Sequence, residues 1–250
     1  MNEKKTLILS VTSVKGGTGK TTTVLNLAGT YCNLKHKVLI IDLDLYSGDI
    51  AAILDLNNEK DIYNLYEDLN NNNFNNIDDY ITHYNEYIDA ICAPNDPRFA
   101  GRINGTIINF ILTKLSKKYD VILIDTNHFL NGLNLTAFDK STEILYILNN
   151  DLMNIKNMKT MVSIFNNMGK KNYKILLYEA KNKNKAPYKK QEIQTLLKHD
   201  IDYIISNKYY IKNINTYIFK GKILTLNSSN QKSIYIDIAT SLMKQVNYEK

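Results

Sequence analysis

The most informative segment reads Ser13-Val14-Lys15-Gly16-Gly17-Thr18-Gly19-Lys20-Thr21-Thr22. It lies between an apolar, β-branched run at residues 6–13 and an amphipathic stretch at residues 21–34, which is a strand-to-helix context. Its three glycines let the backbone curl so that successive N–H groups converge on an anion, and the following helix adds its dipole. The segment therefore predicts a phosphate-binding loop. A glycine-rich turn without a nucleotide is the alternative.

Two side chains of this loop carry the chemistry that a nucleotide requires. Lys20 would reach the β- and γ-phosphates, and the Thr21 hydroxyl would bind Mg²⁺. The ordinary pattern, G-x-x-x-x-G-K-[ST], has glycine where this chain has Val14. The variant K-G-G-x-G-K-[ST]-T fits instead and adds a second lysine, Lys15. The cradle for the phosphates is expected from Gly16, Gly17, Thr18, Gly19, Lys20, Thr21 and Thr22.

Apolar, β-branched runs alternate with longer amphipathic stretches along the whole chain, a pattern typical of βαβ units. Strands are expected at residues 6–13, 37–42, 87–92, 120–125, 143–148, 173–178 and 203–206. Helices are expected at residues 21–34, 103–118, 151–168, 189–198 and 231–246, with Gly169 placed to end the third. The pattern predicts an α/β fold with a doubly wound, mostly parallel sheet, and residues 1–250 are expected to form a single domain.

Length and composition exclude several classes of protein. The chain has 250 residues, of which 44% are hydrophobic and 22% charged, so a sizeable core is expected and disorder is excluded as the main state. No apolar run approaches the roughly 20 residues that a transmembrane helix requires, and no signal peptide is recognised, which predicts a cytoplasmic location. Two isolated cysteines make no disulfide framework.

The net charge of +6 is unevenly distributed. Residues 1–100 carry 8 basic and 14 acidic side chains, whereas residues 101–250 carry 23 and 11. The basic second part could attract nucleic acid or anionic lipid. A general abundance of lysine is the favoured explanation, because Arg98 and Arg102 are the chain's two arginines and bidentate recognition is poorly provided for.

A further carboxylate closes the apolar run Tyr119-Asp120-Val121-Ile122-Leu123-Ile124-Asp125. A carboxylate at the carboxyl end of a parallel strand faces the crevice in which ligands bind. Asp125 is therefore the candidate Walker B residue, which would hold Mg²⁺ through water.

With these motifs the sequence resembles the MinD/ParA family of deviant Walker A ATPases over nearly its whole length. The resemblance implies a P-loop NTPase fold of the SIMIBI type and an ATP-dependent homodimer that hydrolyses ATP slowly. It implies that Lys15 crosses the dimer interface to the partner's phosphates. In Ile41-Asp42-Leu43-Asp44, Asp42 would steady the Mg²⁺ shell and Asp44 would orient the attacking water. Lys15, Lys20 and Asp44 are thus the expected catalytic residues, and Thr21, Asp42 and Asp125 the expected Mg²⁺ site.

Within the family, the sequence is most similar to the CpaE/TadZ branch, which helps to locate Flp/Tad (type IVb) pilus assembly. The similarity lies in residues 42–51 and 54–56, Ala93-Pro94, His128, residues 133–139, and Ile205-Ser206-Asn207. That branch carries a receiver-like domain ahead of the ATPase. The first ATPase strand is expected near residue 6 here, so no N-terminal receiver domain is expected.

The chain departs from the family pattern in two places. Relatives usually have a proline two residues after the Walker B aspartate, where this chain has Asn127. Their sixth strand usually ends in an asparagine whose amide reads adenine, where this chain has Tyr178-Glu179-Ala180. Asn207 could still line the base pocket.

The resemblance leads to one function hypothesis and two rivals. The hypothesis is an ATP- and Mg²⁺-dependent dimeric switch that positions cell machinery with a protein partner at the membrane or pole. One rival is a ParA-type partition ATPase that uses nonspecific DNA. The other is a nucleotide-binding scaffold without turnover. The helix at residues 231–246 could attach the protein to the inner face of the membrane, but packing on the sheet is favoured, because its polar face has few lysines and no large aromatic group.

Overall fold

The computed structural model describes residues 5–179, 187–206, 214–227 and 229–248. Its strands are β1 (Leu7–Ser13), β2 (Val38–Leu43), β3 (Thr82–His83), β4 (Ile88–Ile91), β5 (Val121–Thr126), β6 (Glu143–Asn149), β7 (Tyr173–Tyr178) and β8 (Tyr203–Ile205). They form one sheet in the order β3-β4-β2-β5-β1-β6-β7-β8. β3 pairs with β4 antiparallel, and every other pairing between the described strands is parallel.

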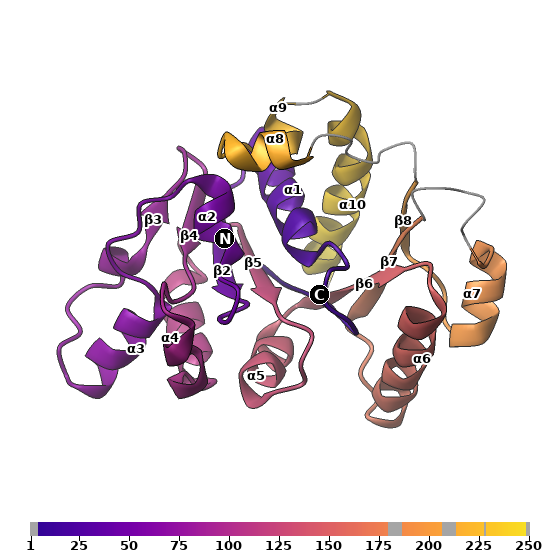
Figure 1. Ribbon diagram of the computed structural model, residues 1–250, viewed down its shortest axis with the longest axis horizontal. Helices are drawn as coiled ribbons and strands as arrows, with labels where there is room; N and C mark the ends of the chain where they lie inside the picture. The colour runs from indigo at the N-terminus through magenta and orange to yellow at the C-terminus, as the bar shows by residue number, and fades with distance from the viewer. Residues whose placement is uncertain (1–4, 180–186, 207–213, 228, 249–250) are drawn as a thin grey trace.

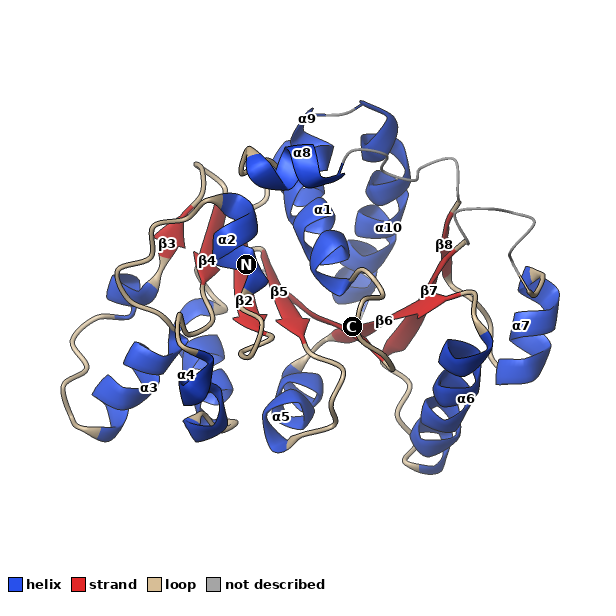
Figure 2. Ribbon diagram, in the orientation of Figure 1, coloured by secondary structure: helices blue, strands red, loops and turns tan. Residues whose placement is uncertain are grey.

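Helices cover both faces of this sheet (Figure 1). They are α1 (Lys20–Asn33), α2 (Asp49–Leu54), α3 (Ile62–Asn70), α4 (Thr106–Leu115), α5 (Gly132–Lys140), α6 (Leu152–Asn167), α7 (Lys190–Leu197), α8 (Ile214–Phe219), α9 (Leu224–Asn227) and α10 (Ser229–Tyr248). Two 3-10 helices, η1 (Ile77–Tyr80) and η2 (Pro97–Arg102), lie between them. In Figure 2, α1, α8, α9 and α10 lie on one side of the strands, and α4, α5 and α6 lie on the other.

The central strands are buried on both faces, which explains their nearly continuous apolar sequences. Alternate residues of β2 enter different cores. Val38 and Ile40 pack with α1 and α10, whereas Leu39 and Ile41 pack with α3 and α4. Because side chains alternate along a strand, one run of apolar residues supplies both layers of the doubly wound fold.

This architecture confirms the predicted fold class. Every predicted strand is present to within one residue at each end, and the five predicted helices are present to within three. Gly169 has φ +66° and follows α6, as predicted. The sequence analysis did not assign β3, α2, α3, α5, α8 or α9. Most of these are short, and α2, α8 and α9 span four to six residues, too few to show a helical period.

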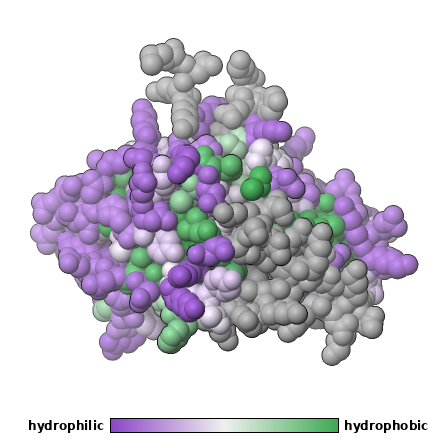
Figure 3. Space-filling view, turned by 90° about the horizontal axis from the view of Figure 1, so that it is seen from above, coloured by the Kyte–Doolittle hydropathy of each residue, from purple (hydrophilic) through white to green (hydrophobic). Residues whose placement is uncertain are grey.

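The last helix packs on the domain as the sequence analysis favoured. Tyr235, Ile238, Ala239 and Leu242 of α10 are buried in the core that also contains α1. Figure 3 looks down on this side and shows separate apolar patches among hydrophilic side chains. In the part of the chain that the structure describes, no helix combines the length and apolar character needed to span a bilayer.

The strand order places a ligand site at one point of the sheet. From β1 the chain moves to one side, through β2 and β4, and later to the other side, through β6 and β7. In open α/β sheets, ligands bind beyond the carboxyl ends of the strands where the order reverses. The loop that follows β1 lies at this position, as do the ends of β2 and β5.

Candidate nucleotide-binding site

The loop between β1 and α1 has the backbone that an anion site requires. Gly17 and Gly19 adopt φ of +71° and +98°, a conformation that side-chain-bearing residues rarely adopt. Gly19 is the N-cap of α1, and no side chain caps the helix. The first N–H groups of α1 are therefore left for another acceptor, at the end of the helix that attracts negative charge.

A cavity of about 500 Å³ opens over this loop. That volume lies within the range of small-molecule sites. Of the residues predicted from the sequence, its lining contains Gly16, Gly17, Thr18, Gly19, Lys20, Thr21, Thr22 and Asp44. The cavity thus joins the whole predicted cradle to the residue predicted to orient water.

The two lysines of the loop lie in different environments. Lys20 is buried and lines the cavity, whereas Lys15 is exposed and does not line it. Burial by itself would raise the pKa of Asp151, but hydrogen bonds from Asn154 and the charge of Lys15 lower it. Asp151 is the N-cap of α6, so the charge of Lys15 acts on the start of α6, while its side chain does not line the cavity.

Asp42 is buried at the end of β2 and organises the turn that follows. Its carboxylate accepts hydrogen bonds from the N–H groups of Asp44 at 3.0 Å and Ile50 at 3.2 Å. Burial, and next the charge of Asp125, raise the pKa of Asp42 well above its ordinary value, against these two hydrogen bonds. The side chain thereby fixes the direction in which Asp44 leaves the strand.

Asp125 is equally buried, and neither of its carboxylate oxygens has a hydrogen-bond partner of normal geometry in the described structure. Burial raises its pKa to about 7, although the Thr21 hydroxyl and the charge of Lys20 act in the opposite direction. Two buried carboxylates that disfavour each other's ionisation, next to a hydroxyl, suit a divalent cation. The residues present therefore fit the Mg²⁺ expected from the sequence.

The donor set also suits Mg²⁺ in its composition. No cluster of three or more His, Cys, Asp or Glu side chains that could hold a metal exists among the described residues. Mg²⁺ usually keeps several waters and uses one or two carboxylates plus substrate phosphates, so a full protein cage is not required.

Asp44 lies between positive and negative groups at the cavity wall. Burial raises the pKa of Asp44, whereas the charges of Lys20 and His128 lower it and that of Asp49 raises it. The side chain is half-buried, so it remains accessible from the cavity.

His128 is a site residue that the sequence analysis did not assign a binding role. It lines the cavity, and its ring lies 3.8 Å from the position that a Cβ on Gly16 would occupy. Tyr46, Ser47, Asp49, Asn127 and Phe129 also line the cavity and were not predicted as site residues. The available signal was their position directly after β2 or β5, because such segments border a ligand crevice.

Asn127 occupies the position at which the family usually has proline. Its Oδ1 accepts hydrogen bonds from the N–H of Phe129 at 3.0 Å and from Nδ2 of Asn134 on α5 at 2.7 Å. A side-chain hydrogen-bond network thus ties this segment to α5. Asn207, proposed for the base pocket, lies outside the described residues.

Comparisons with known proteins agree with this geometry. A family model described as "AAA domain" matches residues 6–178. "ParA family protein MG470" of Mycoplasma genitalium is 27% identical over 181 residues, which cover 66% of this chain and 67% of that protein. "Putative replication protein A" of Sinorhizobium fredii is 27% identical over 62% of this chain, and the match spans 42% of that protein's length.

Solved structures show the same fold. A ParA family ATPase from Chlorobium tepidum TLS superposes with a TM-score of 0.80 at 17% identity, covering 95% of this chain and 99% of the other. The septum site-determining protein MinD of Pyrococcus horikoshii OT3, complexed with Mg-ADP, gives 0.76 at 21% identity, covering 95% and 96%. The chain belongs to the AAA-domain family whose model it matches, and its ParA family relative and its fold support the MinD/ParA type of ATPase.

Proposed function

We propose that this protein is a nucleotide-dependent switch that binds ATP with Mg²⁺, forms a homodimer around two nucleotides, and hydrolyses ATP slowly to reset itself. The observation that carries the proposal is the cavity over the glycine-rich loop, where buried Lys20 and half-buried Asp44 meet next to the Asp42–Asp125 pair. Phosphoryl transfer requires mainly positioning and charge stabilisation, which this arrangement can supply.

The predicted residues of the described site have the following roles in this proposal. Lys20 and the backbone amides of residues 16–22 hold the phosphates, and the Thr21 hydroxyl and the two buried carboxylates hold Mg²⁺ and its water. The metal would neutralise charge on the phosphates. Asp44 orients the attacking water, since it reaches the cavity from a turn that Asp42 holds in place.

Two features support the dimer. Lys15 is exposed and does not line its own cavity, which leaves it available to a second subunit. Several apolar side chains after β2, after β5 and at the start of α6 are each more than half exposed. They are Tyr46, Phe129, Leu130, Leu152 and Met153. An interface needs such apolar area next to its charged contacts.

The cell machinery that we favour is Flp/Tad pilus assembly. The support is the sequence similarity to the CpaE/TadZ branch at residues 42–51 and after β4 and β5. The test is deletion of the gene in its source organism, with complementation by the wild-type protein and by Lys20→Ala. Surface pili restored by the wild type alone are expected, and unchanged piliation in the deletion would contradict this role.

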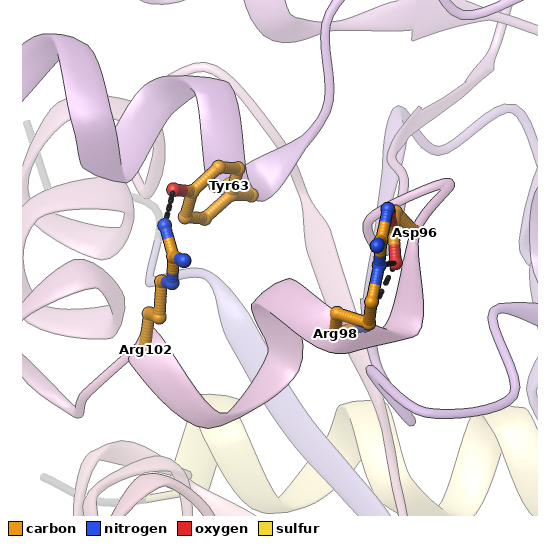
Figure 4. A network of polar contacts seen from close by, with 4 residues as sticks. All are labelled: Tyr63, Asp96, Arg98 and Arg102. Atoms are coloured by element: carbon orange, nitrogen blue, oxygen red, sulfur yellow. Dashed lines mark hydrogen bonds and ion pairs between the residues drawn. The ribbon is translucent and has the colours of Figure 1, made fainter.

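DNA partition is the second candidate, favoured by the ParA family relatives and the basic second part of the chain. The arginines offer it little support. Arg102 donates to the Tyr63 hydroxyl at 2.9 Å and Arg98 pairs with Asp96 at 2.5 Å, and both arginines lie on η2 (Figure 4). Lys170 and Lys174 are paired with Asp139 and Asp202.

Three measurements on one purified preparation distinguish between these candidate functions. Light scattering with ATP or ADP measures the dimer, phosphate release measures turnover, and binding to random duplex DNA between 50 and 200 mM salt tests partition. A partition ATPase should lose DNA affinity by orders of magnitude over that range. ATP-dependent dimers without phosphate release would indicate a scaffold, and absence of ATP binding would refute the proposal.

A further inference from the structure

We infer that Tyr178 is a positioning residue for the phosphate-binding loop, because a chain of hydroxyl groups from Tyr235 through Tyr178 and Thr23 holds the Gly19–Lys20 peptide in its orientation. The inference rests on the proposed binding of ATP at this loop. It concerns the strand end at which members of the resembled family usually have an adenine-reading asparagine and this chain has Tyr178.

Tyr178 is the last residue of β7, and its ring lies against the loop. A Cβ placed on Gly19 would be 3.7 Å from the ring. The Tyr178 hydroxyl is 3.0 Å from Oγ1 of Thr23 on α1 and 2.7 Å from the hydroxyl of Tyr235 on α10. Three elements that are distant in sequence therefore meet at one tyrosine hydroxyl.

Counting protons shows which hydroxyl donates in each of these hydrogen bonds. Thr23 Oγ1 donates to the Gly19 carbonyl at 2.8 Å, which uses its one hydroxyl proton. Tyr178 must then donate to Thr23, and Tyr235 must donate to Tyr178. Burial raises the pKa of both tyrosines, so both hydroxyls keep their protons at neutral pH.

The chain of hydroxyl groups ends at the Gly19–Lys20 peptide, whose N–H is a proposed donor to the phosphates. The Gly19 carbonyl also accepts from the Thr23 N–H at 2.9 Å, so two bonds fix its direction. The peptide that joins Gly19 to Lys20 is planar and trans, so its N–H points opposite to its carbonyl. Holding the carbonyl toward Thr23 therefore directs the Lys20 N–H away from the helix and toward the site proposed for the phosphates.

Gly19 needs this restraint because glycine is the residue least restricted in φ and ψ. A rotation of its peptide would withdraw one amide from the cradle without disturbing the core. Tyr235 is buried on α10, so the same contacts also link the position of the last helix to the loop.

The experiment compares Tyr178→Phe and Thr23→Val with a matched control, Tyr203→Phe. Tyr203, the first residue of β8, also joins a strand to α10, through a 3.0 Å contact between its hydroxyl and Ser241 Oγ, and this hydrogen bond does not involve the loop. Calorimetric titration with Mg-ATP, Mg-ADP and inorganic tripolyphosphate measures affinity, and thermal unfolding measures stability.

Tyr178→Phe and Thr23→Val should each weaken all three ligands by about three- to tenfold, the scale of one lost hydrogen bond. The double variant should bind the three ligands no more weakly than either single variant, since both substitutions break the same chain of hydroxyl groups. Tyr203→Phe should unfold at a similar temperature to Tyr178→Phe and retain wild-type affinity.

Three results would overturn the inference. Wild-type tripolyphosphate affinity in Tyr178→Phe would mean that the residue acts on the base or only on stability. Additive effects in the double variant would mean two separate contacts, and equal losses in Tyr203→Phe would mean a general effect of α10. Failure of the wild-type protein to bind Mg-ATP would instead refute the proposed function.

Discussion

Asp42 and Asp125 lie directly opposite each other on the parallel strands β2 and β5, and both side chains are buried. Two carboxylates in this position resist simultaneous ionisation because burial and mutual repulsion both favour a bound proton. A cation or a proton must therefore offset their charge. A bound Mg²⁺ would offset this charge.

This pair makes the metal-free protein sensitive to pH. The folded-state pKa of Asp125 is about 7, well above the roughly 3.9 of an exposed aspartate. The folded state thus binds the proton more tightly, and this contribution to stability is lost as pH rises from about 4 to 7. Asp125→Asn removes the charge and should raise the unfolding temperature of the metal-free protein at pH 8 by several degrees, since roughly 2–4 °C corresponds to 1 kcal/mol.

Thermal unfolding without nucleotide at pH 5 and pH 8 measures this effect. Asp79→Asn, which removes an exposed carboxylate from η1, is the control and should change little at either pH. An Asp125→Asn protein that is destabilised at pH 8 would show that the carboxylate is not strained in the metal-free state.

Lys20 should be essential for holding nucleotide. Its ammonium is buried at the cavity and compensates the charge of Asp44 and Asp125, so Lys20→Ala should lower ATP affinity by about a hundredfold or more while circular dichroism stays unchanged. Lys118→Ala, which breaks a surface pair with Asp78, is the control. Equal ATP affinities of the wild type and Lys20→Ala by calorimetry would show that Lys20 does not hold the nucleotide.

Asp44 should matter for turnover more than for binding. It is half-buried at the cavity wall, where it can orient water, and Asp44→Ala should reduce steady-state phosphate release by about a hundredfold or more. ATP affinity should fall little, and ATP-bound dimers should accumulate. Asp55→Ala, at the end of α2 and outside the cavity lining, is the control, and turnover unaffected by Asp44→Ala would refute the role.

The sequence was sufficient for the parts of this site that depend on local backbone geometry. The glycine positions and the flanking apolar runs located the loop, and Gly17 and Gly19 adopt the positive φ that such a loop needs. Asp125 was proposed because it closes an apolar run and Asp42 because of the family resemblance, and the parallel strands bring the two together. Short contexts of this kind determine structure without knowledge of distant contacts.

What the sequence could not provide depends on distant contacts. His128 carries no ligand spacing, and it reaches the cavity because β5 lies beside β1 in the sheet. Tyr178 meets Thr23 and Tyr235 across 155 and 57 residues of chain, and no local period encodes such a meeting. The helices α2, α8 and α9 form through packing on neighbours, since isolated helices of that length are unstable in water.

We expect nucleotide to assemble two copies of this chain through Lys15. In Asp44→Ala protein, which should retain ATP, light scattering with Mg-ATP should give dimers. Adding Lys15→Ala to this protein should leave ATP affinity unchanged by calorimetry, because Lys20 and the loop amides remain. Loss of a charge-assisted contact at a desolvated interface typically costs about 2–5 kcal/mol, which weakens dimerisation about thirtyfold or more.

The decisive measurement is light scattering of that double variant with Mg-ATP, at protein concentrations near the dissociation constant of the Asp44→Ala dimer. Monomers with bound ATP are the predicted result. Dimers of unchanged affinity would contradict the role of Lys15, which would then be a solvated loop residue, and the nucleotide would not act through a second subunit's lysine.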